Sequence, residues 1–453
     1  MRSNLKSLAL VAACAAASLA ASQCASPKNG RSATAAGGDT PSVGRLEPAT
    51  WTARSTPEEI AAWARRGCGG GVVHKDDCLE HALTSVLPTA GVDKAMAALL
   101  ILSKEDEDVA RDGHVFAHGI GISAYKSPET VAQTFALCTT DFQSGCYHGV
   151  IQAYFADKRA GEGVTPGKLN ALCQPYHSPE KRWLEFQCAH GIGHGVMAVE
   201  SHNLLHALDS CDLITDRFER EACWGGAFME NVVNATQPHH QSVTQVGEHA
   251  EHGGDHHDMA GHDMAGHDMA GMDHGEHGAG EPFMALDPRE PLYPCTVVKE
   301  QHRTACYLMQ TSAILYRNNG DFRDAARQCA RSPEEYHNTC YISLGRDANS
   351  WGRGSQERAI EYCTAAPEAG QPWCIVGVVK NIVDVTADPR DGLSFCRLAP
   401  DNTRPACYNA VGQQIAILQP TWPGREQACR AADAGYVPEC RRGAGLPLIP
   451  GNG

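Results

Sequence analysis

The sequence predicts an all-α protein built from disulfide-stapled helix hairpins, which repeat about every 34 residues and form a solenoid. Three observations lead to this expectation. The chain of 453 residues contains 20 cysteines, ten of them in five pairs of identical spacing, and the segments between the pairs have helical patterns. Repeats at a fixed period of roughly 20 to 50 residues are typical of solenoids.

The five pairs define the C-terminal repeats, which we place at residues 287–445, with a tail at 446–453. Their first members advance by 34, 34, 33 and 33 residues. A disulfide that closes a loop of this size stabilises a unit by roughly 2 to 3 kcal/mol in the chain-entropy model. The predicted disulfides are Cys295–Cys306, Cys329–Cys340, Cys363–Cys374, Cys396–Cys407 and Cys429–Cys440.

Each repeat is expected to be a helix, a short loop and a second helix. Residues 321–329 and 355–363 begin with Asp321 and Ser355, which are residue types that cap helix N-termini, and continue with good helix formers. Apolar segments then start at Cys340 and Cys374. The disulfide therefore joins the end of the first helix to the start of the second.

Paired helices with a period of 34 residues resemble the tetratricopeptide class of solenoids, over most of residues 60 to 445. The resemblance implies a stack of helix hairpins, each in contact with its neighbours. The Trp, Leu-Gly and Tyr signature of that class is not evident, so the resemblance implies architecture and no particular partner.

Residues 56–236 follow the same period less strictly and are expected to form the N-terminal repeats. The first members of their cysteine pairs lie 70, 35 and 38 residues apart. The interval of 70 spans two periods, which predicts a repeat without a disulfide near residues 95–125, with Phe116 near the cysteine position. The predicted disulfides are Cys68–Cys78, Cys138–Cys146, Cys173–Cys188 and Cys211–Cys223.

The N-terminus and the cysteine content indicate export to an oxidising compartment, the periplasm or the cell surface. Residues 1–23 have the pattern of a signal peptide, and Cys24 is the expected site of lipidation, because the other eighteen cysteines of a lipoprotein cleaved there can all pair. Cleavage at Cys14 would leave Cys24 unpaired, and a plainly secreted protein is the alternative. Residues 24–55, rich in Ser, Ala, Gly and Pro, are expected to be a flexible tether.

The net charge of −15 argues against nucleic-acid binding, which depends on Lys and Arg.

Residues 237–286 interrupt the repeats and are expected to be a disordered insert. The insert resembles the Met/His tracts of bacterial periplasmic copper-resistance proteins; thioethers suit Cu(I), and imidazoles suit Cu(II), Zn(II) and Ni(II). A polar spacer is the alternative. The candidate ligands are His262, Met264, His267, Met269, Met272 and His274.

Five histidines of the N-terminal repeats form a second candidate metal site. His190 and His194 lie four residues apart, which on a helix places both imidazoles on one face. The equivalent positions of the C-terminal repeats hold no histidine, so the fold does not require it. Stacked repeats about 10 Å apart are expected to bring these side chains together around one or two metal ions. The full set is His114, His118, His148, His190 and His194.

Two other interpretations of these histidines remain open. They are packing residues next to helix crossings that glycine permits, or they line a metal-free catalytic or ligand-binding cleft. The nearby glycines, Gly119, Gly121, Gly149, Gly191, Gly193 and Gly195, favour close approach of backbones or of a ligand. Weaker candidates are His202, His206, Glu200 and Glu230.

The sequence therefore predicts an exported helical-repeat protein, held at a membrane only by a lipid anchor, that binds a transition metal. Copper is the preferred ion, with zinc, nickel and iron as alternatives. The other hypotheses are a scaffold that binds a protein partner on the solenoid surface and a metal-dependent enzyme. Whether the protein is an enzyme is not decided by the sequence.

Overall fold

The computed structural model describes residues 46–69, 75–161, 163–236 and 283–447, and these residues form helices and loops without a β-strand. The all-α prediction is therefore confirmed. The predicted signal peptide, Cys24, most of the predicted tether, the six candidate ligands of the His/Met tract and most of the predicted tail lie outside the described residues. Among the described helices, none combines the length and the apolar character needed to cross a bilayer.

The N-terminal repeats contain four long helices that carry the candidate histidines and Glu230, with shorter helices between them. In chain order the helices are α1 (Pro57–Cys68), α2 (Lys75–Ser85), α3 (Leu87–Ala90), α4 (Val92–Glu105), α5 (Glu107–Ala124), α6 (Val131–Phe135), α7 (Gly145–Ala156), α8 (Pro166–Leu172), α9 (Arg182–Val199), α10 (Leu204–Cys211) and α11 (Arg217–Thr236). Short 3₁₀ helices are η1 (Pro128–Thr130), η2 (Lys158–Ala160), η3 (Gln174–Tyr176) and η4 (Pro179–Lys181).

The C-terminal repeats alternate short and long helices in their middle part. They are α13 (Glu300–Tyr307), α14 (Gln310–Arg317), α15 (Phe322–Cys329), α16 (His337–Gly352), α17 (Gln356–Cys363), α18 (Gln371–Thr386), α19 (Pro389–Leu398), α20 (Arg404–Leu418), α21 (Trp422–Cys429) and α22 (Val437–Gly443). The 3₁₀ helices η5 (Glu334–Tyr336) and η6 (Ala434–Tyr436) precede α16 and α22.

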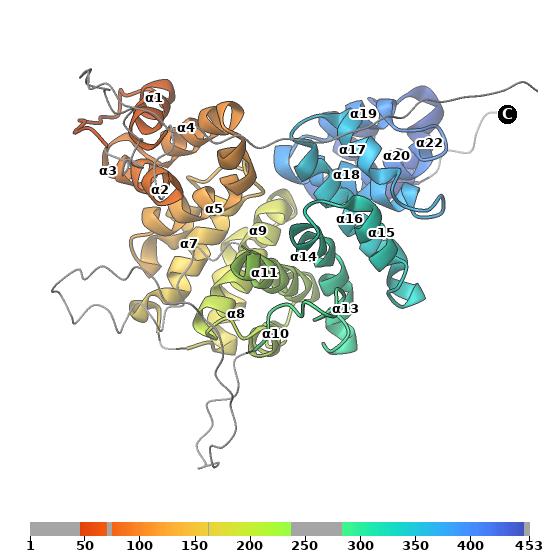
Figure 1. The fold of residues 1–453 in the computed structure, drawn as a ribbon, viewed down its shortest axis with the longest axis horizontal. Helices are drawn as coiled ribbons and strands as arrows, with labels where there is room; N and C mark the ends of the chain where they lie inside the picture. Colours follow the sequence, from red (N-terminus) through yellow and green to blue (C-terminus); the bar gives the residue numbers. More distant parts are fainter. Residues whose placement is uncertain (1–45, 70–74, 162, 237–282, 448–453) are drawn as a thin grey trace, which may run out of the picture. The chain divides into compact units, whose positions relative to one another are not determined.

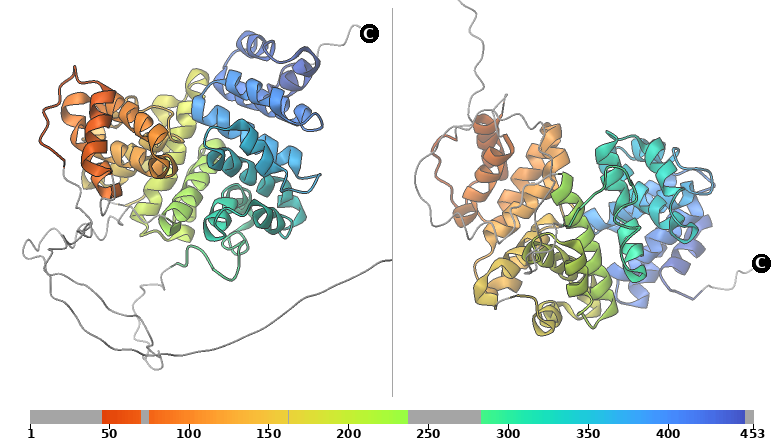
Figure 2. Two further views of the ribbon diagram at one scale, coloured as in Figure 1. Left: turned by 45° about the horizontal axis from the view of Figure 1, so that its top comes forward. Right: turned by 60° about the horizontal axis from the view of Figure 1, so that its bottom comes forward.

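The second helices of successive hairpins pack against one another in chain order. α5 contacts α7, α7 contacts α9, and α9 contacts α11; α16, α18, α20 and α22 form a corresponding series. Figures 1 and 2 show these helices following one another side by side. α4 and α5 pair without a disulfide, at the place where the 70-residue interval predicts such a repeat.

All nine predicted disulfides are present. In the Cys295–Cys306 disulfide, Cys295 lies in a run of turns and Cys306 lies near the end of α13. In the C-terminal repeats Cys329 ends α15 and Cys340 lies in the first turn of α16. Asp321 caps α15 by accepting from two backbone N–H groups, and Ser355 caps α17 by accepting from one. The predicted unit of helix, disulfide-closed loop and helix is thereby confirmed for four of the five C-terminal disulfides, whereas the described residues before Cys295 form turns in place of the first helix.

Glycine pairs allow the closest helix crossings. A Cβ added to Gly121 of α5 would collide with the Cys146 carbonyl, and one added to Gly149 of α7 would collide with the His118 carbonyl. The same reciprocal arrangement joins α9 to α11, α16 to α18 and α20 to α22, through Gly193 and Gly226, Gly345 and Gly377, and Gly412 and Gly443. Only glycine permits this approach, which occurs at every second contact between successive second helices within each half of the described chain.

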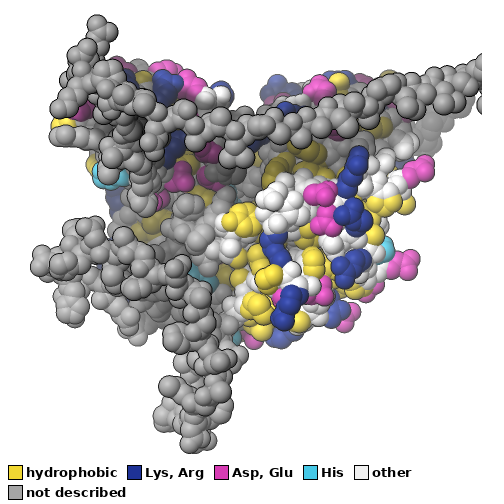
Figure 3. Space-filling view, in the orientation of Figure 1, with side chains coloured by type: hydrophobic (Ala, Val, Ile, Leu, Met, Phe, Trp, Pro, Cys, Tyr) yellow, Lys and Arg dark blue, Asp and Glu magenta, His cyan; other side chains and the backbone are white. Residues whose placement is uncertain are grey.

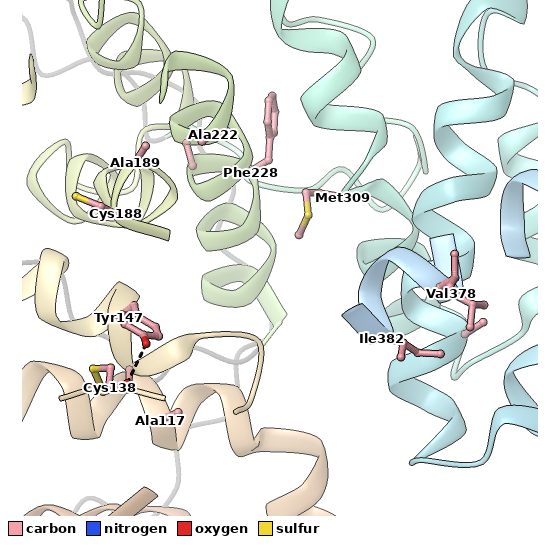
Figure 4. Packing of buried hydrophobic residues seen from close by; sticks show 14 of the residues in the cluster. Ala117, Cys138, Tyr147, Cys188, Ala189, Ala222, Phe228, Met309, Val378 and Ile382 are labelled. Atoms are coloured by element: carbon pink, nitrogen blue, oxygen red, sulfur yellow. Dashed lines mark hydrogen bonds between the residues drawn. A yellow bond between two sulfur atoms is a disulfide. The ribbon is translucent and has the colours of Figure 1, made fainter. Parts of the chain in front are cut away.

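Buried apolar side chains, including the disulfide cysteines, run through the whole stack. Figure 4 shows part of this core from close by. In that view the Tyr147 hydroxyl donates to the Cys138 carbonyl at 2.9 Å, which fixes α7 to the preceding loop. The ring of Phe135 packs against the rings of Tyr147 and Tyr176, at centroid distances of 4.6 Å and 5.0 Å. These rings fill the space beside the helix that carries His148.

Two predicted boundaries differ from the structure. Trp51 belongs to the predicted tether but packs edge-on against Trp63 of α1, and the Glu47 carbonyl accepts from the Trp63 indole at 2.8 Å. The predicted insert ends at 286, whereas Phe283 packs against the core and Ala285 accepts from Asn231 at 3.0 Å. Both segments bury aromatic rings, which offsets the entropy of ordering them.

Candidate metal centre

Three helices bring the five candidate histidines together. His114 and His118 lie one turn apart on α5, His148 lies in the first turn of α7, and His190 and His194 lie one turn apart on α9. The i, i+4 spacing places both rings of α5, and both rings of α9, on the side that faces their neighbours. The convergence expected from the repeat is confirmed.

The rings form one continuous cluster around His194. From its ring the centroids of His148, His118 and His114 lie at 4.7, 5.3 and 6.2 Å. His190 is 4.8 Å from His148 and 5.3 Å from His194. Residues as far apart in the chain as 114 and 194 therefore come within the reach of a single small ligand.

The cluster is secluded from solvent. His118, His148, His190 and His194 are 1%, 2%, 7% and 0% exposed, and His114 is partly buried. On the face shown in Figure 3, histidine appears only at scattered places. Five imidazoles buried together are costly unless their nitrogens are satisfied.

A strained turn holds His114. Its Nδ1–H donates to the Phe142 carbonyl at 2.9 Å. Phe142, Gln143 and Ser144 have φ angles of 54°, 53° and 63°, a left-handed conformation that disfavours each non-glycine residue by roughly 1 to 2 kcal/mol. The turn lies inside the loop that the Cys138–Cys146 disulfide closes, which maintains this conformation. Strain of this kind is typical of functional sites.

Side-chain acceptors orient His148 and His194. His148 Nε2–H donates to Gln187 Oε1 at 3.2 Å, and His194 Nδ1–H donates to Glu230 Oε2 of α11 at 2.7 Å. The side chains of His194 and Glu230 are each only 1% exposed. The short distance and the complete burial make this a strong charge-assisted hydrogen bond.

These hydrogen bonds determine which nitrogens remain for a ligand. His148 Nδ1 and His194 Nε2 are buried without a hydrogen-bond partner, and His114, whose Nδ1 is bonded to Phe142, could ligate through Nε2. One ligand atom from each of these three histidines lies within 4.8 Å of the others. In a tetrahedral zinc or copper site the nitrogens lie about 3.4 Å apart, so small side-chain rotations would close the set.

The protonation of the cluster also fits a cation site. Burial lowers the pKa of His148 well below its usual 6.5, and the neighbouring His194 and His190 lower it further. Burial likewise lowers the pKa of His190, with His194 and His114 as the next contributors. Neutral imidazole is the form that binds metal.

Of the four weaker candidates, Glu230 lies in the histidine cluster, and the other three lie outside the two groups of ligand atoms in this cluster. Glu230 belongs to the centre, and with His118 and His194 it makes a second group of ligand atoms within 4.8 Å. Glu200 instead accepts from the Ser210 hydroxyl at 3.1 Å, and His206 is exposed. His202 is partly buried and close enough to Glu230 for that carboxylate to oppose the lowering of the His202 pKa by burial.

Gln187 is the functional side chain that sequence reasoning missed. It directly precedes Cys188, so the cysteine period gave its position, but one glutamine among many polar helix residues carries no signal of a role.

The glycine crossings show that His118 and His190 occupy equivalent places, because their carbonyls face Gly149 and Gly226. Ile342 and Asn409 fill the corresponding places of the C-terminal repeats, so the cluster is confined to the N-terminal ones.

No protein-family model, curated protein or solved structure that was compared with the chain matches it.

Proposed function

We propose that this protein binds a transition-metal ion at its buried histidine centre, with His114, His148 and His194 as ligands and copper as the preferred ion. The observation that carries the proposal is the arrangement of acceptors. A backbone carbonyl, an amide oxygen and a carboxylate each hold one nitrogen of a ring and leave the other for a ligand. Metal-binding histidines commonly have such outer partners.

The donor set favours copper(II), with zinc as the next choice. Sites with nitrogen and oxygen ligands generally bind Cu(II) more tightly than Ni(II) or Zn(II). All eighteen cysteines of the described residues are in disulfides, so thiolates do not compete. The His/Met tract, with His262 and Met264 among its residues, would gather ions weakly and pass them to the centre.

A direct test compares three proteins made with their disulfides. The first has His114, His148 and His194 changed to Ala, the second lacks residues 237–282, and the third carries the control changes His81→Ala and His206→Ala, which alter exposed histidines. After dialysis, elemental analysis should find metal in the second and third proteins and a loss of at least one equivalent in the first. Full retention by the first protein would overturn the proposal.

A second candidate function is a metal-dependent enzyme, and one observation favours it. His118, His194 and Glu230 supply two imidazoles and one carboxylate, the ligand set of non-haem iron oxygenases. Iron found by elemental analysis, with loss of iron in Glu230→Gln, would support this alternative. Copper or zinc in the purified protein would argue against it.

A further inference from the structure

A second cluster of metal-ligand side chains lies near the N-terminal ends of α9 and α11. One ligand atom from each of His177, Glu185 and Glu219 lies within 4.8 Å of the others. His177 follows η3 inside the loop closed by the Cys173–Cys188 disulfide, whereas Glu185 and Glu219 lie in the first turns of their helices. Three separate segments are thus held together by a covalent staple and by the α9–α11 packing.

The cluster holds two buried carboxylates, each paired with one basic side chain. The side chains of Glu219 and Glu185 are only 2% and 5% exposed. His177 Nε2–H donates to Glu219 at 2.6 Å, and Arg182 donates to Glu185 at 3.0 Å. The Arg182 guanidinium also lies over the ring of Phe218, 3.6 Å from its centroid, which fixes its position.

Hydrogen bonding and burial both favour protons on this cluster. The hydrogen bond to Glu219 raises the pKa of His177, although burial opposes the shift. Burial raises the pKa of Glu219. A divalent cation could replace these protons, since carboxylates and imidazoles must be deprotonated to bind it.

This cluster, unlike the histidine centre, opens to solvent. The His177 side chain is 41% exposed. A cleft of about 490 Å³ lies against it, and its lining includes His177, Arg182, Glu185, Asp216 and Arg425. A site with three protein ligands and access to solvent keeps coordination positions for water or another ligand, as catalytic zinc sites do.

We propose that His177, Glu185 and Glu219 bind a divalent cation of hard or borderline character, Mn²⁺ or Zn²⁺, with its remaining coordination positions facing the cleft. Two carboxylates favour the harder ion and the imidazole the borderline one. Arg182 acts as the outer partner that orients Glu185. The guanidinium groups of Arg182 and Arg425 favour an anion as the ligand that completes the coordination. This site is independent of the function proposed above.

The test measures Mn²⁺ binding by electron paramagnetic resonance, in full-length protein whose histidine centre is removed by His114→Ala, His148→Ala and His194→Ala. This background should bind one equivalent of Mn²⁺ that Zn²⁺ displaces. Adding His177→Ala or Glu219→Gln should weaken binding at least tenfold. The matched control adds His206→Ala and Glu221→Gln, which change an exposed histidine and an exposed glutamate of α11, and should bind like the background.

Two results would overturn the proposal. One is a background protein that binds neither Mn²⁺ nor Zn²⁺, which would leave an ion pair between His177 and Glu219 only. The other is binding that neither His177→Ala nor Glu219→Gln weakens. If circular dichroism shows that the background does not fold, His177→Ala and Glu219→Gln are each introduced into the wild-type chain. Each change should then remove one equivalent of bound metal. The expected loss of one equivalent does not depend on the histidine centre. Either proposal can therefore fail without the other.

Discussion

Glu230→Gln tests how the buried carboxylate would support the proposed metal centre. Glutamine keeps the shape and an oxygen that accepts from His194 Nδ1–H, but it removes the negative charge 2.7 Å from that nitrogen. The charge increases the electron donation of the ring to a metal on Nε2, and loss of such an outer partner typically weakens metal binding about 10- to 100-fold. Glu230→Ala removes the acceptor as well and should lie at the weaker end of this range.

The magnitude can be measured as metal-induced stabilisation. At a free metal concentration about 100 times the Kd, binding stabilises the native state by about 2.7 kcal/mol. A tenfold weaker site at the same concentration gives about 1.4 kcal/mol, and a 100-fold weaker site about 0.4 kcal/mol. Urea unfolding with and without copper, in a metal buffer, measures these differences directly.

The control is Glu221→Gln, because the Glu221 side chain lies on the same helix, is 48% exposed and forms an ion pair with the exposed Arg217. It should keep the full stabilisation. Measuring each variant without metal separates the effect on the apoprotein from the effect on binding. Equal stabilisation of Glu230→Gln, Glu230→Ala and the wild type by copper would refute the role assigned to Glu230.

Three further predictions concern stability. Gly149→Ala forces a methyl group into a backbone carbonyl of α5. It should lower the free energy of unfolding, measured by urea titration, by at least about 1 to 3 kcal/mol. Gly167→Ala is the control and should leave this free energy unchanged, because the added carbon meets nothing. Asp321→Ala removes the cap of α15 and should cost about 1 kcal/mol, and unchanged urea midpoints would contradict the assigned cap. Burial lowers the pKa of His148 and His190 below 6.5, so below about pH 6.5 the unfolded chain binds more protons. The apoprotein should therefore lose up to about 1.4 kcal/mol per pH unit for each ring as the pH falls, and stability that is flat between about pH 7.5 and 5.5 would refute this.

The cysteine period made most of the fold predictable. A pair such as Cys363 and Cys374 marks the end of one helix and the start of the next, because the disulfide requires the two backbones to lie close together. The period also gave the repeat without cysteines, since α4 and α5 fill the missing interval. The boundaries were less predictable, because contacts such as Trp51 on Trp63 depend on tertiary packing rather than on local pattern.

The candidate centre was predictable in its histidines but not in their partners. Spacing placed His190 and His194 on one face of a helix, and the repeat placed His148 beside them. The Phe142 carbonyl could not be foreseen, because its orientation depends on a left-handed turn that no glycine marks. The cluster of His177 and Glu219 was missed because its members share no periodic spacing and meet only through the packing of α9 against α11.

The disulfides have a consequence for the order of assembly. Every cysteine in the described residues is oxidised, and those next to the histidine centre include Cys146 and Cys188. In a reduced chain the same sulfur atoms would be thiols, which capture soft and borderline ions more readily than imidazoles do. Ions that arrived before oxidation would be held on sulfur, away from the nitrogens. Loading of the proposed centre would therefore require that thiol oxidation comes first, and a refolding experiment that supplies copper before the oxidant should yield protein with copper bound to sulfur.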